Sequence, residues 1–308
     1  MSLVNYNKPP LTFAQQVTSL EEKGICFNDK SLAEKKLASI SYYRLSGYWY
    51  PFRIRDVQHN VTNKVQAGTN FDDVLFLYEI DRQLRSLVLD AIERVEVAVR
   101  TQFTYHIGHQ YGAFGYTDKN NFHPKFNHQN WIKKLEYEAD RSSDDFIKHF
   151  SVKYIGFPTI PIWMLTEVMS LGALSTGYNG LINDQKKSIE DKKIISQHFN
   201  LHHKKLGDWL HTLTYVRNIC AHHSRLWNRS LAIKPDKTND INWLPPITPR
   251  KDRIFYALLM LRYLLKATGG GDKWALEINR LLEPLADSNQ WRAAMGLPEN
   301  WREHPIWK

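Results

Sequence analysis

The chain has 308 residues, of which 43% are hydrophobic and 24% charged, and these are ordinary proportions for a soluble globular protein. Its 41 lysines and arginines outnumber its 32 aspartates and glutamates, and the net charge of +9 favours polyanionic partners such as nucleic acid. Two cysteines are too few for a disulfide framework, and no run approaches the roughly 20 apolar residues of a membrane span or resembles a secretory signal, so we expect a cytoplasmic protein without a membrane partner.

The N-terminal part is predicted to contain two helices, at residues 11–23 and 30–40, because apolar residues recur there at helical spacing. The following segment, 42–52, interleaves arginines with tyrosines and a tryptophan. Rings of this kind stack on bases and guanidinium groups bind phosphates, so Tyr43 and Arg44 are candidate RNA-binding residues. The alternative is an aromatic clamp that holds the N-terminal helices to the core.

The longest predicted helix, 71–109, follows a polar stretch, 56–70, that is typical of a loop or small hairpin. Its apolar residues form one continuous stripe. Glu93, Glu96 and Arg100 share the opposite face. One interpretation is a solvated ladder of ion pairs, since Glu96 and Arg100 have the favourable i,i+4 order. The other is that the carboxylates meet a later arginine or histidine and set its charge state.

The middle of the chain is predicted to hold a loop at 110–130 and helices at 131–150, 162–178 and 184–198. Glu167 falls among apolar residues of the third segment. A carboxylate in such surroundings usually has a cationic partner, so Glu167 is also a candidate supporting acid.

Histidines recur along this region and raise the question of a metal site. His106, His109 and His123 have no carboxylate or cysteine at ligand spacing, which favours surface or capping roles. His198 and His202 are spaced i,i+4, but two histidines without a third ligand are weak evidence. The sequence therefore predicts no metal site.

The segment 203–221 is predicted to be a helix that ends in an unusual concentration of polar groups. Its apolar stripe consists of Leu206, Trp209, Leu210, Leu213, Val216 and Cys220. Arg217 lies within roughly 40° of the centre of this stripe, so its charge needs an acidic partner, a phosphate or a second protein surface. His222 would point to the opposite side of a continued helix. For both residues to serve one site, the helix must bend or end near Ala221, or two copies of the chain must share the site.

The remainder is predicted to be an extended, proline-rich connector at 232–250 followed by helices at 251–267 and 273–286 and a short helix before Gly296. Helical patterns dominate, so the predicted fold class is all-α. The expected organisation is an N-terminal helical and aromatic segment (1–70), a helical core with the motif (71–232) and a C-terminal helical region packed on that core (233–308).

The string from Arg217 to Arg229, Arg-Asn-Ile-Cys-Ala-His-His-Ser-Arg-Leu-Trp-Asn-Arg, resembles the signature of the Abi-like family, bacterial abortive-infection proteins of the AbiD/AbiF type. Its first part resembles the R-x(4–6)-H motif of the HEPN superfamily, which includes many metal-independent ribonucleases. The resemblance extends in order through segments 41–49, 78–85, 93–96, 163–167 and 298–301. It implies a HEPN-like helical bundle with additional N- and C-terminal helices, in which a carboxylate from an earlier helix lies near the motif.

RNA cleavage without a metal requires a base for the 2′-OH proton, an acid for the 5′-oxygen and positive charge on the phosphorane. His222 is the candidate acid and base, because the pKa of histidine lies near neutrality. Arg217 is the candidate phosphate clamp and Asn218 the residue that orients one of them. His223 is the alternative histidine, and the spacing does not decide between the two. No metal or other cofactor is expected.

Arg225 and Arg229 are expected to bind flanking phosphates of the RNA. A symmetric dimer would bring two sets of these residues together, so a homodimer is expected. The resemblance implies a role in anti-phage defence as a toxin that cleaves RNA. Some relatives of the AbiF type are associated with a small non-coding RNA that restrains them, so RNA is expected as regulator as well as substrate. The competing hypothesis is a non-catalytic RNA-binding protein that uses the same basic and aromatic surface, and a metal-dependent hydrolase is a third possibility.

Overall fold

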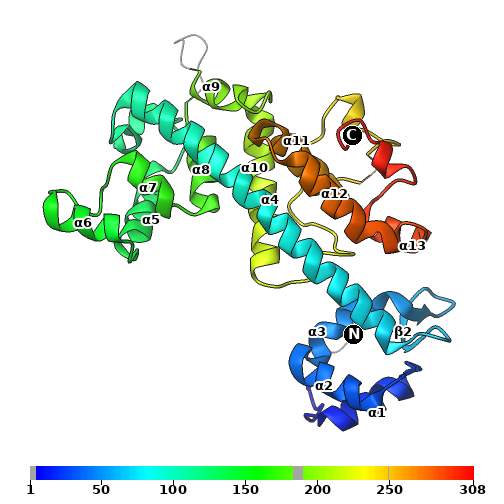
Figure 1. Ribbon diagram of the computed structural model, residues 1–308. Helices are drawn as coiled ribbons and strands as arrows, with labels where there is room; N and C mark the ends of the chain where they lie inside the picture. Colours follow the sequence, from blue (N-terminus) through cyan, green and yellow to red (C-terminus); the bar gives the residue numbers. More distant parts are fainter. Residues whose placement is uncertain (1–4, 183–189, 249) are drawn as a thin grey trace. The chain divides into compact units, whose positions relative to one another are not determined.

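The computed structural model describes residues 5–182, 190–248 and 250–308. Over these residues the chain is mainly helical and has a single two-stranded sheet, which confirms the predicted all-α class (Figure 1). The chain divides into two compact units, one up to Gln83 and one from Leu84 on, and the division lies inside the long helix α4 (Phe71–Tyr111). In the described part of the chain, no helix combines the length and the apolar character that crossing a membrane requires.

The N-terminal unit confirms both predicted helices and the expected hairpin. It contains α1 (Phe13–Glu22), α2 (Lys30–Ile40), α3 (Tyr42–Trp49), the antiparallel strands β1 (Arg53–Arg55) and β2 (Val61–Val65), and the first part of α4. The aromatic segment is the helix α3, which buries Tyr48 and Trp49. The Tyr48 hydroxyl donates a hydrogen bond to Asp81 at 2.5 Å. This part of the segment acts as the aromatic clamp, whereas Tyr43 and Arg44 on the same helix are exposed.

The second unit is built on the remainder of α4 and a series of shorter helices. These are α5 (His128–Asp140), α6 (Asp145–Lys153), α7 (Ile162–Val168), α8 (Leu171–Gly180), α9 (Asp191–Gln197), α10 (His203–Ala221), α11 (Ile254–Thr268), α12 (Gly271–Leu282) and α13 (Asn289–Met295). The motif helix α10 has the predicted bounds and packs against α8, α9 and α11 (Figure 1). Of the helix predicted at 184–198, residues 184–189 lie outside the described residues.

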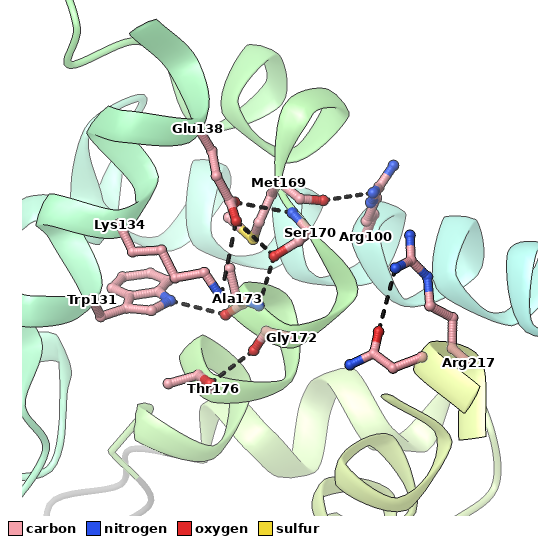
Figure 2. Close-up of polar contacts among 11 residues, drawn as sticks. Arg100, Trp131, Lys134, Glu138, Met169, Ser170, Gly172, Ala173, Thr176 and Arg217 are labelled. Carbon is pink, nitrogen blue, oxygen red and sulfur yellow. Dashed lines mark hydrogen bonds and ion pairs between the residues drawn. The ribbon is translucent and has the colours of Figure 1, made fainter. Parts of the chain in front are cut away.

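Two predicted helices are wrong as continuous elements: the segment 131–150 is divided into α5 and α6, and 162–178 into α7 and α8. The second break occurs at Met169 and Ser170, whose backbone is extended. Glu138 accepts hydrogen bonds from the Ser170 backbone N–H at 3.0 Å and from its hydroxyl at 2.7 Å (Figure 2). The Ser170 hydroxyl in turn accepts from the Ala173 N–H and caps α8. The break therefore depends on a carboxylate from another helix.

The close packing of α8 against α5 gives a testable expectation. A Cβ atom at Gly177 would lie 2.4 Å from Cζ2 of Trp131, a buried ring whose Nε1 is hydrogen-bonded to the Ala173 carbonyl at 2.8 Å. Because the ring is held in place, Gly177→Ala is expected to lower the free energy of unfolding by about 1–3 kcal/mol. Gly172→Ala on the same helix meets only ordinary contacts of 3.6 Å or more and should leave stability unchanged or slightly raised. Urea denaturation of both variants checks this, and equal losses would contradict it.

Candidate functional site

The motif helix α10 ends at Ala221 with a hydrogen-bonded C-terminal turn. The N–H of His223 donates to the Cys220 carbonyl at 3.0 Å, and the N–H of Ser224 donates to the Ile219 carbonyl at 2.9 Å. This pair of bonds is the Schellman motif, which closes a helix by turning one residue into the left-handed region. The expected end of the helix near Ala221 is thereby confirmed.

The residue in the left-handed position is His223, with φ of +54°. Glycine usually occupies this place because a Cβ atom there costs roughly 1–2 kcal/mol. His222, which caps the helix, and His223 are both exposed. The strained turn therefore presents two adjacent imidazoles to solvent directly after the helix.

The strain at this turn can be measured. His223→Gly is expected to be about 1 kcal/mol more stable than His223→Ala, because both variants lose the imidazole and only glycine adopts positive φ without the Cβ conflict. His223→Asn also loses the imidazole but keeps a side chain that tolerates the left-handed region, so its stability should fall between the two. Thermal or urea unfolding compares the three variants. Equal stabilities of the glycine and alanine variants would show that the turn is not strained.

Arg217 lies on the last turns of α10 and is half-buried. Its Nη1 donates to Oδ1 of the neighbouring Asn218 at 3.3 Å (Figure 2). Its acidic neighbour is Glu96 on α4. Burial raises the pKa of Glu96 above its ordinary value, and the positive charges of Arg100 and Arg217 oppose that rise. Arg217 thus lies within electrostatic range of this carboxyl group, as its position near the apolar stripe required.

Arg100 completes the cluster and is fixed by two oxygen atoms. Its Nη2 donates to Oε1 of Glu96 at 2.5 Å and to the carbonyl of Met169 at 2.5 Å, the latter at the break between α7 and α8 (Figure 2). The side chains of Glu96 and Arg100 are only 13% and 20% exposed. The predicted i,i+4 ion pair between Glu96 and Arg100 is present. The interpretation that this pair is solvated is wrong, because both side chains are largely buried. We refer to Glu96, Arg100 and Arg217 as the arginine–glutamate cluster.

Among the three candidate supporting acids, Glu96 has an electrostatic link to Arg217. Glu93 is exposed, and its negative charge adds to the raised pKa of Glu96. Glu167 was expected among apolar side chains, but it is exposed on α7. That expectation is wrong because Glu167 lies on the same face of α7 as the exposed Trp163, four residues earlier.

The side chains of Arg217 and His222 leave α10 in directions about 140° apart, since they are five residues apart on a helix. Because α10 ends at Ala221, the backbone can turn after His222. That two copies of the chain share one site remains a prediction.

The candidate phosphate-binding residues fall in two regions. Arg225 and Arg229 follow the motif, and Nη1 of Arg229 donates to the Arg225 carbonyl at 3.1 Å. The positive charge of Arg225 contributes to the lowered pKa of Arg253, after burial and the charge of Arg250. This segment is therefore electropositive. Tyr43, with 88% of its surface exposed, lies beside Arg44 on α3 in the other unit.

A buried histidine was missed by sequence analysis. His106 was expected to have a surface or capping role, but it is buried, and its Nε2 lies 2.6 Å from Oδ1 of Asp191. Oδ2 of the same carboxylate accepts a hydrogen bond from the Tyr111 hydroxyl at 2.8 Å. The partner is 85 residues away in sequence, so helical spacing gave no signal for it. The cluster joins the end of α4 to the start of α9.

Clusters of three or more histidine, cysteine, aspartate or glutamate side chains suited to a metal ion do not occur among the residues with described positions.

Comparison with known proteins gives one match. A protein-family model described as Abi-like protein matches residues 35–228, which include the aromatic segment, α4 and the complete motif. Neither the curated proteins nor the solved structures contain a match.

Proposed function

The chain belongs to the Abi-like family, a membership that suggests a role in abortive infection, and from this premise we propose that it is a metal-independent endoribonuclease. The observation that carries the proposal is the arginine–glutamate cluster beside a helix end that bears two exposed histidines. The fixed positive charge of Arg217 lies on α10, and the two imidazoles follow directly after its end.

In the proposed reaction, the 2′-oxygen of a ribose attacks the adjacent phosphorus and the bond from phosphorus to the 5′-oxygen breaks. His222 accepts the 2′-OH proton, and a protonated histidine donates a proton to the leaving 5′-oxygen. The products are a 2′,3′-cyclic phosphate and a 5′-hydroxyl. His223 is the second candidate for either proton transfer.

Arg217 stabilises the extra negative charge on the phosphorane oxygens, because a guanidinium keeps its charge and presents forked donors. Glu96 is hydrogen-bonded to Arg100 and experiences the positive charges of both Arg100 and Arg217. Its carboxylate thereby helps to hold two guanidinium groups at the site. Asn218, hydrogen-bonded to Arg217, orients the guanidinium.

The biological proposal has three further parts. RNA cleavage halts growth of the infected bacterial cell, a symmetric pair of chains brings two motifs together, and a small non-coding RNA restrains the enzyme. The electropositive segment around Arg225 and Arg229 supports RNA as a partner in either role, because phosphate contacts dominate RNA affinity.

The alternative is a non-catalytic RNA-binding protein. The exposed Tyr43 and Arg44 favour it, since stacking and phosphate contacts need no chemistry.

A cleavage assay with defined products tests the proposal. The purified protein, freed of co-purifying RNA, is incubated with end-labelled RNA, with DNA of the same sequence, and with RNA plus EDTA. We expect cleavage of RNA alone, 2′,3′-cyclic phosphate ends and no effect of the chelator. Loss of cleavage with EDTA would favour a metal-dependent hydrolase, whereas binding without cleavage would favour the alternative.

A further inference from the structure

A pocket of about 570 Å³ lies between α4 and α7, next to the arginine–glutamate cluster. Arg100 belongs both to its lining and to the cluster. The volume falls within the range of about 300–1,000 Å³ that is typical of sites for small ligands. The pocket therefore has room for one nucleotide and opens beside the proposed phosphate site.

The walls of the pocket carry two exposed aromatic rings from different helices. Tyr105 on α4 has 63% of its surface exposed and Trp163 on α7 has 52%. The ring of His109 lies 4.0 Å from that of Tyr105, and its Nδ1 is 2.8 Å from the Tyr105 carbonyl oxygen. Flat apolar rings that face solvent at the rim of a pocket are the usual platform for stacking an unpaired base.

Polar groups are distributed along the same lining in a way that suits a nucleotide. The cationic Arg100 lies at the side of the cluster, where a phosphate would be neutralised. The exposed carboxylate of Glu167 and the hydroxyl of Thr101 also belong to the lining. A carboxylate accepts hydrogen bonds from the exocyclic amino groups of bases, and a hydroxyl can donate or accept.

We propose that this pocket binds one unpaired base of single-stranded RNA, stacked on Trp163 and Tyr105, with the adjoining phosphate directed to Arg100 and Arg217. The proposal rests on the proposed function, because it assigns the recognition of the substrate to the surface beside the same cluster. In a duplex the faces of each base are stacked on the neighbouring base pairs, so the pocket selects single strands over duplexes. The charge of Arg100 at the pocket favours this occupant over an apolar protein surface.

The test separates binding from cleavage. The wild-type protein and its variants are titrated with a fluorescent single-stranded RNA that carries 2′-O-methyl groups and cannot undergo the transesterification. Trp163→Ala and Tyr105→Ala are each expected to raise the Kd about fivefold to 100-fold, as loss of a stacked base does elsewhere. Trp163→Phe should keep most of the affinity. A duplex of the same sequence should bind with a Kd that these variants leave unchanged.

Tyr137→Ala is the matched control, because Tyr137 is also 63% exposed but lies on α5 outside the pocket lining. The Kd of Tyr137→Ala for the single-stranded RNA should equal that of wild type. Circular dichroism and thermal unfolding establish that the variants are folded.

The outcomes are distinguishable from failure of the nuclease proposal. Weakened binding by the pocket variants, together with no cleavage by wild type, would keep the pocket and remove the ribonuclease. Unchanged binding by Trp163→Ala would overturn the pocket even if cleavage of unmodified RNA is found. Sedimentation of wild type as a dimer and of both pocket variants as monomers would also overturn it, since the rings would then contact a second copy of the chain.

Discussion

Replacing Arg217 by alanine is expected to reduce the rate of RNA cleavage by about 10²–10³-fold, the usual effect of removing one donor to a developing oxyanion. Glu96 keeps its hydrogen bond to Arg100 in this variant, so the fold should persist. Arg217→Lys keeps the charge but loses the forked donors, and it should recover only part of the rate. Single-turnover cleavage of labelled RNA measures the loss, and thermal unfolding confirms that the protein is intact.

The histidines are separated by the same assay. His222→Ala is expected to lower cleavage by about 10²–10⁴-fold, as loss of a general acid or base does. His211→Ala is the control, because His211 is an exposed histidine on the same helix and outside the motif. If His222→Ala cleaves like wild type while His223→Asn is inactive, the proton-transfer role passes to His223. Cleavage by His222→Ala, His223→Asn and Arg217→Ala alike would remove the assignment of the site.

The largest loss of stability is expected from His106→Leu. This change leaves the buried carboxylate of Asp191 without its imidazole partner, and breaking a buried pair from one side costs about 3–5 kcal/mol. Urea denaturation should show a free energy of unfolding that is lower by that amount, with a correspondingly lower midpoint. His109→Leu, at an exposed position on the same helix, should change the free energy of unfolding by only about 0.5 kcal/mol.

A double variant tests whether the loss of stability in His106→Leu comes from the unpaired carboxylate of Asp191. His106→Leu combined with Asp191→Leu removes both polar partners, and replacing a complete buried pair by apolar side chains is often nearly neutral. The double variant should therefore be more stable than His106→Leu alone. A further loss in the double variant would mean that Asp191 stabilises the fold through Tyr111 and not through the histidine.

Local patterns predicted what depends on local sequence. The apolar stripe of residues 203–221 gave both ends of α10, and the stripe after residue 71 gave α4. Side chains four residues apart lie together on a helix, so the shared face of Glu96 and Arg100 predicted their ion pair.

What the sequence did not predict depends on distant partners. The break between α7 and α8 requires Glu138, 32 residues before Ser170, and nothing in the pattern of 162–178 reveals that hydrogen bond. Arg100 was not recognised as a member of the site because its second acceptor, the Met169 carbonyl, exists only where that helix is interrupted. The burial of His106 was not predicted either, because its partner Asp191 lies 85 residues later in the sequence.

The break between α7 and α8 places one peptide group between two charged side chains. The Met169 carbonyl and the Ser170 N–H belong to one amide group, whose oxygen binds the cation of Arg100 and whose hydrogen binds the anion of Glu138. An amide held between opposite charges is polarised, and each bond strengthens the other. Neutralising Glu138 is therefore expected to weaken the hydrogen bond between the Met169 carbonyl and Arg100. In this way a residue remote from the histidines influences how firmly the Arg100 guanidinium is held.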